Sequence, residues 1–234
     1  MHKSLPFFIA LLLMSSYTNV QEIPVNELLG KFNPATHPDF IKIDDEYTSK
    51  SDIYLRKEAY KAFKNMYWDA KKCGIELQIK SATRNFNYQK GIWERKFKRP
   101  KYKGWDEIEI VKDIMKYSSM PGTSRHHWGT DIDLNALENS YFEHGEGKRT
   151  YEWLRDFGTE YGFYQVYTSK EDGRAGYEEE KWHWTYLPSS KAYLIQYLST
   201  VTYEDIKGFS GSEQAKNIGA IENYVGGVNP KILK

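Results

Sequence analysis

Two segments of the chain gather side chains that bind metal ions. Residues 121–134, PGTSRHHWGTDIDL, hold two histidines and two aspartates within eight positions around a glycine. Residues 178–184, EEEKWHW, place a histidine three positions after a glutamate. A catalytic zinc takes three nitrogen or oxygen ligands from the protein and a water as the fourth. Solvated charges in a polar turn are the alternative, but so many potential ligands in a chain with only six histidines favour a metal site.

The candidate ligands can be narrowed by position. Three histidines are set aside because they fall in the leader or in polar, loop-like surroundings: His2, His37 and His144. Adjacent residues on an extended chain point in opposite directions, so at most one of His126 and His127 is expected to serve the same ion as His183. Asp131 and Asp133 would share one face of a strand, and their spacing does not choose between them.

A catalytic base and a cationic group are also present. A carboxylate near a zinc-bound water can take its proton, and Glu180 precedes His183 by three residues. On a straight strand these two side chains would face opposite ways, so a bend is required. The alternative is an exposed acidic run at residues 178–180. Arg84, in the segment SATRN, follows the end of an expected strand and could be aimed into a cleft.

The elements that must position these residues can be read from hydrophobic spacing. Apolar residues recur with the helical period from Tyr54 to Cys73, and Gly74 is a plausible C-terminal cap. This pattern places Cys73 on the apolar stripe of the helix, in the core. Residues 75–79 alternate as in a half-buried strand.

The remaining elements give a mixed fold. Helices are expected at 86–98, 106–116 and 150–161, strands at 132–134, 163–168 and 182–186, and two short helices in 189–234. We therefore expect an α+β fold with a small, mainly antiparallel sheet flanked by helices. The expected organisation is a leader at 1–20, one main domain at 21–190 that carries both metal-binding segments, and a helical C-terminal extension at 191–234.

Bulk properties limit the function. The formal net charge of +1 gives no reason to expect a nucleic-acid surface, and a single cysteine excludes an intramolecular disulfide. Lys3 followed by the short apolar run 5–14 is typical of a secretory signal peptide. We therefore expect an exported protein of the periplasm or cell-wall space. No stable membrane anchor is expected after removal of the signal.

Two motifs carry a resemblance to a known family. SRHHWGTDID matches the pattern S-x-H-x-x-G-x-x-x-D, and EKWH matches E-x-W-H. Both are signatures of the zinc D-alanyl-D-alanine carboxypeptidases related to VanY, the LAS peptidases. YLRKEAYKAF, SATRNFNYQ and YGFYQVY also resemble segments of that family in order and spacing. The likeness covers roughly residues 50–190.

The resemblance implies roles for the metal-site residues. His126, Asp133 and His183 would be the zinc ligands. Glu180 would be the general base and later the proton donor to the leaving amine. On this basis Zn²⁺ is the expected cofactor.

The resemblance also implies a substrate site. Arg84 would bind the substrate carbonyl or carboxylate and stabilise the developing oxyanion. Ser124 and Gln89 would help to hold the substrate. Two residues depart from the family pattern: Asp131 stands where a small residue is usual, and Thr83 stands where an aromatic is usual.

The expected function is hydrolysis of peptidoglycan stem peptides, in the first place as a D-alanyl-D-alanine carboxypeptidase that releases terminal D-alanine. An L,D-carboxypeptidase or a peptidoglycan endopeptidase of the same family is the alternative. A non-catalytic, zinc-stabilised wall-binding module is a further one, but it would need neither Glu180 nor Arg84. The expected partners are peptidoglycan stem peptides, and no nucleic acid.

Overall fold

The protein is built on a four-stranded antiparallel sheet. A computed structural model describes residues 22–234, and the expected leader at 1–20 lies outside the described residues. The strand order is β3-β4-β6-β5, which confirms the α+β fold with a small antiparallel sheet. The strands are β3 (Ile79–Ser81), β4 (Asp131–Leu134), β5 (Phe163–Gln165) and β6 (His183–Tyr186).

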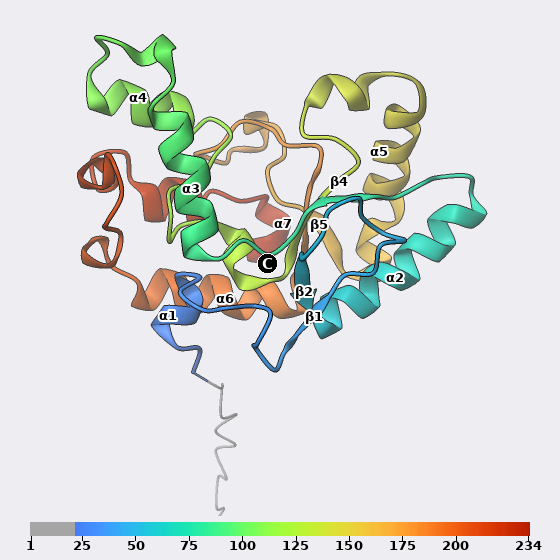
Figure 1. The fold of residues 1–234 in the computed structure, drawn as a ribbon. Coiled ribbons are helices and arrows are strands. Elements are labelled where there is room, and N and C mark those ends of the chain that lie inside the picture. The colour runs from blue at the N-terminus through green and yellow to red at the C-terminus, as the bar shows by residue number, and fades with distance from the viewer. Residues whose placement is uncertain (1–21) are drawn as a thin grey trace, which may run out of the picture.

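One face of the sheet packs against two helices. Side chains alternate along a strand, and on β4 the residues Ile132 and Leu134 belong to this hydrophobic face, as does Trp184 of β6. Helices α2 (Lys57–Lys72) and α5 (Gly145–Phe157) cover it, on the right in Figure 1. The 3.6-residue periodicity expected for α2 is confirmed, since its buried residues lie on one stripe facing this cluster.

The opposite face of the sheet is polar at its centre. Asp131 and Asp133 share this face of β4, as their spacing predicted. Asp133 lies directly between Ser81 on β3 and His183 on β6. An irregularity in β3 between Ile79 and Ser81 sets this register. Strand pairing therefore brings together three polar residues that are far apart in the sequence.

A second hydrophobic cluster closes the polar face. It is formed around α3 (Phe86–Phe97), α4 (Glu107–Ile114) and α6 (Leu187–Thr200), and includes Trp93, Val111 and Tyr197. In Figure 1, α3 and α4 lie at the upper left and α6 runs below the sheet. The site thus lies between two packed layers, in a position from which water can be partly excluded.

The C-terminal residues are part of this second cluster. The boundary expected after residue 190 falls inside α6, and Tyr197 of α6 packs against Trp128 with ring centroids 6.0 Å apart. Two short helices were expected in 189–234. The chain instead forms most of the 14-residue α6, then short helical turns, a π-helical segment Ala220–Val225 and α7 (Pro230–Leu233).

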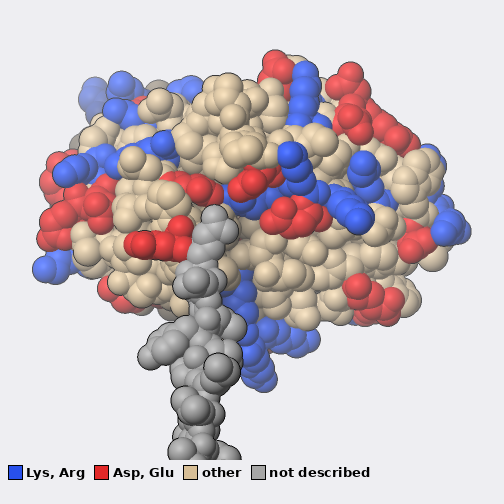
Figure 2. Space-filling view, turned by 90° about the horizontal axis from the view of Figure 1, so that it is seen from below, with Lys and Arg blue, Asp and Glu red and all other residues tan. Residues whose placement is uncertain are grey.

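The N-terminal segment is largely irregular, as expected. It contains α1 (Val25–Leu28) and β1 (Phe40–Lys42), and β1 pairs with β2 (Tyr54–Arg56). None of the helices within residues 22–234 combines the length and apolar character needed to cross a membrane. Basic and acidic side chains are largely interspersed over the face shown in Figure 2, in keeping with a net charge near zero.

Several local expectations were wrong. The helix expected from Tyr54 begins at Lys57, because residues 54–56 pair with β1. Cys73 is exposed rather than buried, since it lies at the C-terminal cap, beyond the last buried turn of α2. Ile75 and Leu77 are buried, but only Ile79–Ser81 pair as a strand. Gly74 does end the helix, with a φ of 71°.

Candidate metal centre

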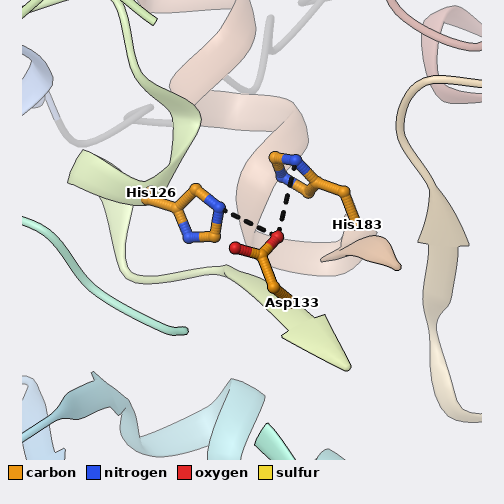
Figure 3. Close-up of side chains that lie close together, drawn as sticks. All are labelled: His126, Asp133 and His183. Atoms are coloured by element: carbon orange, nitrogen blue, oxygen red, sulfur yellow. Dashed lines mark ion pairs between the residues drawn. The ribbon is translucent and has the colours of Figure 1, made fainter. Parts of the chain in front are cut away.

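Three side chains converge in the way that a metal ion requires. His126 Nε2 lies 3.3 Å from Asp133 Oδ1, and His183 Nδ1 lies 3.8 Å from the same oxygen. One ligand atom from each of the three residues lies within 4.8 Å of the other two, and all three residues are buried. Zinc ligands at about 2.0–2.1 Å in a tetrahedron are roughly 3.4 Å apart. Figure 3 shows both imidazoles directed at the Asp133 carboxylate.

The elements behind the three ligands differ. Asp133 and His183 are cross-strand partners on β4 and β6. His126 comes from a single 3₁₀ turn, η2 (Arg125–Trp128). Gly129 ends this turn with a φ of 73°, and a Cβ there would overlap the ring of Phe40. The glycine of the motif is therefore required both by its backbone conformation and by the close packing of an aromatic ring.

The two adjacent histidines have separate roles, as predicted, but for a different reason. They lie on a 3₁₀ turn rather than on an extended chain. His127 turns away from the cluster. Its Nδ1 donates to the carbonyl of Arg84 (2.5 Å), and its Nε2 accepts from the N–H of Gly122 (3.0 Å). Burial lowers the pKa of His127 to about 3, which keeps it neutral for this pair of bonds.

The cluster contains buried polar atoms without a hydrogen-bond partner. His126 Nδ1 donates to the carbonyl of Ala82 (2.9 Å), which leaves the Nε2 lone pair facing the cluster. Within residues 22–234, neither His126 Nε2 nor Asp133 Oδ1 has a hydrogen-bond partner, although both are buried. Unpaired buried polar atoms are uncommon. A cation bound between them would satisfy both, so the residues fit a metal ion.

The protonation states of two ligands suit a cation. Burial lowers the pKa of His126 to about 4, so this imidazole is neutral at pH 7. Burial alone would raise the pKa of Asp133, but the neighbouring His126 outweighs it and the pKa falls to about 2. Neutral imidazole and ionised carboxylate are the forms that bind metals.

His183 differs from His126. Burial lowers its pKa, but hydrogen bonds to Asp131 and Glu180 outweigh burial and raise the pKa to about 9. Its Nε2 lies 3.0 Å from Asp131 Oδ2, on the side away from the cluster. A metal ion at the cluster would therefore replace the proton on Nδ1.

Glu180 reaches the cluster through a turn. The N–H of His183 donates to the carbonyl of Glu180 (3.3 Å), and Glu180 Oε2 lies 2.9 Å from His183 Nδ1. The bend required by the sequence is therefore present, as a turn rather than a bulge. Burial raises the pKa of Glu180 above its ordinary value. The expectation of an exposed acidic run does not hold for this residue, which is only 5% exposed.

A cavity of about 310 Å³ opens on the cluster. Arg84 lines it, donates from Nη1 to Ser81 Oγ (3.1 Å), and its Nη1 lies 3.7 Å from Asp133 Oδ2. Gln89 also lines it and donates to the carbonyl of Ser119 (2.7 Å), while its Oε1 has no partner in the described chain. Ser124 is buried next to η2 and is not among the described residues that line this cavity.

One lining residue was missed by the sequence reasoning. Lys96 faces the cavity together with Gln89 and Ile92, all on one side of α3. Its ammonium group forms no ion pair or hydrogen bond within residues 22–234. Burial, with Arg99 and Arg84 nearby, lowers its pKa to about 8. The spacing 89, 92 and 96 is that of one helix face, and this pattern could have identified Lys96.

A buried His–Asp–His set beside a buried glutamate, in a cavity that also holds an arginine, is the arrangement of a metal-dependent hydrolase site. Residues 52–189 match the sequence profile of the family described as VanY: D-alanyl-D-alanine carboxypeptidase. The chain belongs to this family, which confirms the resemblance drawn from its motifs.

The chain also resembles individual members of the family. It is 31% identical over 178 residues to YodJ of Bacillus subtilis (strain 168), whose name places it among the carboxypeptidases, with 72% of this chain and 59% of that protein covered. It is 26% identical over 182 residues to a D-alanyl-D-alanine carboxypeptidase of Enterococcus faecalis, with 74% and 65% covered. The chain thus spans less than two thirds of the length of these curated relatives.

Solved structures share the fold. The LdcB LD-carboxypeptidase is 25% identical with a TM-score of 0.55, covering 81% of each chain. VanYB in complex with D-alanine-D-alanine is 22% identical with a TM-score of 0.51, covering 69% of this chain and 94% of that one. A VanY D,D-pentapeptidase in complex with Zn(II) is 21% identical with a TM-score of 0.51, covering 74% and 92%. The last two likenesses bear on the fold alone.

Proposed function

We propose that this chain is an exported zinc-dependent peptidase that hydrolyses peptidoglycan stem peptides, in the first place as a D-alanyl-D-alanine carboxypeptidase. The observation that carries the proposal is the pair of unpartnered buried atoms, His126 Nε2 and Asp133 Oδ1, beside the buried carboxylate of Glu180. A binding module stabilised by zinc would need the ligands but not the glutamate. The presence of Glu180 beside the zinc ligands therefore favours an enzyme.

His126, Asp133 and His183 would hold the zinc ion through Nε2, a carboxylate oxygen and Nδ1. When bound, zinc polarises the scissile carbonyl and acidifies a water molecule. Glu180 would take a proton from the attacking water on its carboxylate and pass it to the leaving amine. Its raised pKa suits this exchange, because a carboxylate with a pKa nearer neutrality both accepts and releases a proton readily.

The cavity cations would hold an anionic peptide. Arg84 keeps a buried Nε without a partner among the described residues, and it offers planar donors to a carbonyl or carboxylate oxygen. Lys96 adds a second positive charge, which forms no ion pair with a carboxylate within residues 22–234. Gln89 Oε1 is free to accept from a peptide N–H. Ser124, buried and also unpartnered at Oγ, would take part only after a local shift.

A second cleavage specificity has its own support. LdcB, which is named an LD-carboxypeptidase, is 25% identical to this chain and covers 81% of it. An endopeptidase activity is a third outcome, because a second cavity continues past Arg84 and shares Lys50, Ser81 and Tyr88 with the first. A longer peptide could occupy both cavities.

Digestion of purified peptidoglycan separates these activities. The zinc-loaded protein is incubated with intact sacculi, and the products are identified by mass. Loss of a terminal D-alanine from pentapeptides supports the proposal. Loss of D-alanine from tetrapeptides assigns the L,D activity instead, and cleavage of cross-links assigns an endopeptidase. The same sacculi, with no change in mass but with protein retained on them, would assign the non-catalytic binding module.

A further inference from the structure

A network of buried polar side chains lies on the side of His183 that faces away from the metal cluster. Its centre is the fully buried Asp131. Oδ2 of Asp131 accepts from His183 Nε2 (3.0 Å) and Arg125 Nε (3.0 Å). Oδ1 accepts from Thr185 Oγ1 (2.5 Å) and Thr130 Oγ1 (2.8 Å). These bonds occupy the lone-pair sites of a carboxylate, so Asp131 keeps no oxygen free for a metal.

Stability alone does not account for this network. Arg125 is also fully buried and donates from Nη2 to Thr185 Oγ1 (3.0 Å), and its Cζ lies 4.5 Å from the ring centroid of Trp128. Removing two charges from water is unfavourable, and apolar side chains of similar volume would often stabilise a core as well or better. A buried ion pair at this position therefore needs another explanation.

The two histidine ligands are held by different acceptors. His126 donates from Nδ1 to a neutral backbone carbonyl, that of Ala82. His183 donates from Nε2 to the charged carboxylate of Asp131. Such a partner fixes the rotation of the ring, and a carboxylate also makes the opposite nitrogen a stronger electron donor. Without it, the imidazole of His183 could rotate and turn a carbon towards the cluster.

We propose that Asp131, itself held in place by Arg125 and Thr185, is a positioning residue that fixes His183 with Nδ1 towards the metal and raises the affinity of the site for zinc. This inference rests on the proposed function, because it requires zinc at the cluster. It separates the two aspartates of the DID sequence by role. Asp133 binds the ion, and Asp131 holds a ligand of the ion.

Zinc affinity of the full chain, measured by competition with a chromogenic chelator, tests the inference. Asp131→Ala should weaken zinc binding by about 10- to 100-fold, the usual effect of removing such a partner. Thr130→Val is the matched control, because Thr130 bonds to Oδ1 of the same carboxylate, whereas His183 and Arg125 both bond to Oδ2. It should change the affinity by less than about threefold. Unfolding temperatures measured in parallel exclude a general loss of structure.

Asp131→Ala leaves Arg125 buried without its partner and could prevent folding. The double variant Arg125→Met with Asp131→Ala removes both charges, and it should fold and show the same loss of zinc affinity. A second readout is the Nε2–H proton resonance of His183 in the zinc-loaded protein. It should be protected from exchange in the wild type and in Thr130→Val, and lost in the Asp131 variants.

Equal zinc affinity of wild type and the folded Asp131 variants, with the His183 Nε2–H still protected, would overturn the inference and leave the proposed function standing. Failure of the wild type to take up zinc would overturn both. The two failures are therefore distinguishable in one set of measurements.

Discussion

The two sides of the His183 ring are built in opposite ways. On the cluster side, His126 Nε2 and Asp133 Oδ1 are buried and have no hydrogen-bond partner in the described chain. On the other side, Asp131 accepts bonds from His183, Arg125, Thr130 and Thr185, and none of its oxygens is free. Both sides are equally removed from solvent, since Asp131 and Asp133 are at most 3% exposed.

This difference shows how to separate a working site from its support. A buried polar group without a partner is unfavourable, so a set of them facing one point indicates a ligand that the protein binds there. A buried carboxylate of which both oxygens already accept hydrogen bonds indicates a group whose position is being fixed. Residue type and burial alone would assign both aspartates to the metal, whereas their hydrogen bonds distinguish them.

The largest effect is expected from substituting the aspartate that binds the ion. Asp133→Asn should abolish stoichiometric zinc binding and all activity, because an amide is a much poorer zinc ligand than a carboxylate. Asp131→Asn should still bind about one zinc per chain, with reduced affinity. Metal analysis of the purified variants checks both. A metal-free Asp131→Asn and a zinc-replete Asp133→Asn would mean that the roles of the two aspartates are reversed.

Glu180 lies on the cluster side but is expected to act on protons rather than to hold the ion. Glu180→Gln should keep zinc and unfolding temperature unchanged while slowing turnover by roughly 10²-fold or more, the scale of a positioned acid–base group. Steady-state kinetics on a synthetic stem peptide measures this. Near-normal turnover in the zinc-replete variant would remove Glu180 from the mechanism.

Arg84 is expected to act on the substrate rather than on the metal ion. Arg84→Lys keeps the charge but loses the planar set of donors, so kcat/KM should fall roughly 10²-fold with little change in stability. If Arg84 binds the terminal carboxylate, amidation of that carboxylate should penalise the wild type strongly and Arg84→Ala hardly at all. An equal penalty in both would leave Arg84 with the oxyanion role only. If Arg84→Lys keeps the kcat/KM of the wild type, Arg84 has no role beyond a surface ion pair.

Lys96 should have the smallest effect, and one that depends on pH. Its pKa is lowered to about 8, so the side chain is charged below that pH and becomes neutral above it. If it attracts the anionic end of the peptide, KM should rise between pH 7 and pH 9, by up to roughly tenfold as the charge is lost. Lys96→Arg keeps its charge at both pH values and should flatten this rise. The same rise in both proteins would assign the pH dependence to another group.

The elements of the fold could be predicted where local patterns decide them. The α3 helix begins at Phe86 as predicted, and Asn85 caps it by accepting from the N–H of Tyr88 (2.9 Å). The period of two on β4 correctly placed Asp131 and Asp133 on one face. Cys73 was misplaced because helical spacing alone does not show where the helix leaves the core.

The candidate site was predicted in its parts but not in its geometry. The motifs named the three residues that the structure brings together, and spacing alone left Asp131 and Asp133 equivalent. Their difference depends on Arg125 and Thr185, which reach Asp131 from other elements. Contacts of this kind follow from strand register and the shape of η2, which no local pattern encodes. The same holds for Lys96, whose importance appears only when α3 is packed beside the cluster.

The most direct test of the account follows zinc and D-alanine in the same samples. The protein is stripped with a chelator, reloaded with zinc, and incubated with a synthetic stem pentapeptide that ends in D-alanyl-D-alanine. We expect about one zinc per chain after reloading. The reloaded wild type should release D-alanine, and the stripped protein should not. Reloaded Glu180→Gln should release no more than a trace. Release that survives removal of zinc, or no cleavage of any stem peptide by the reloaded wild type, would contradict the account.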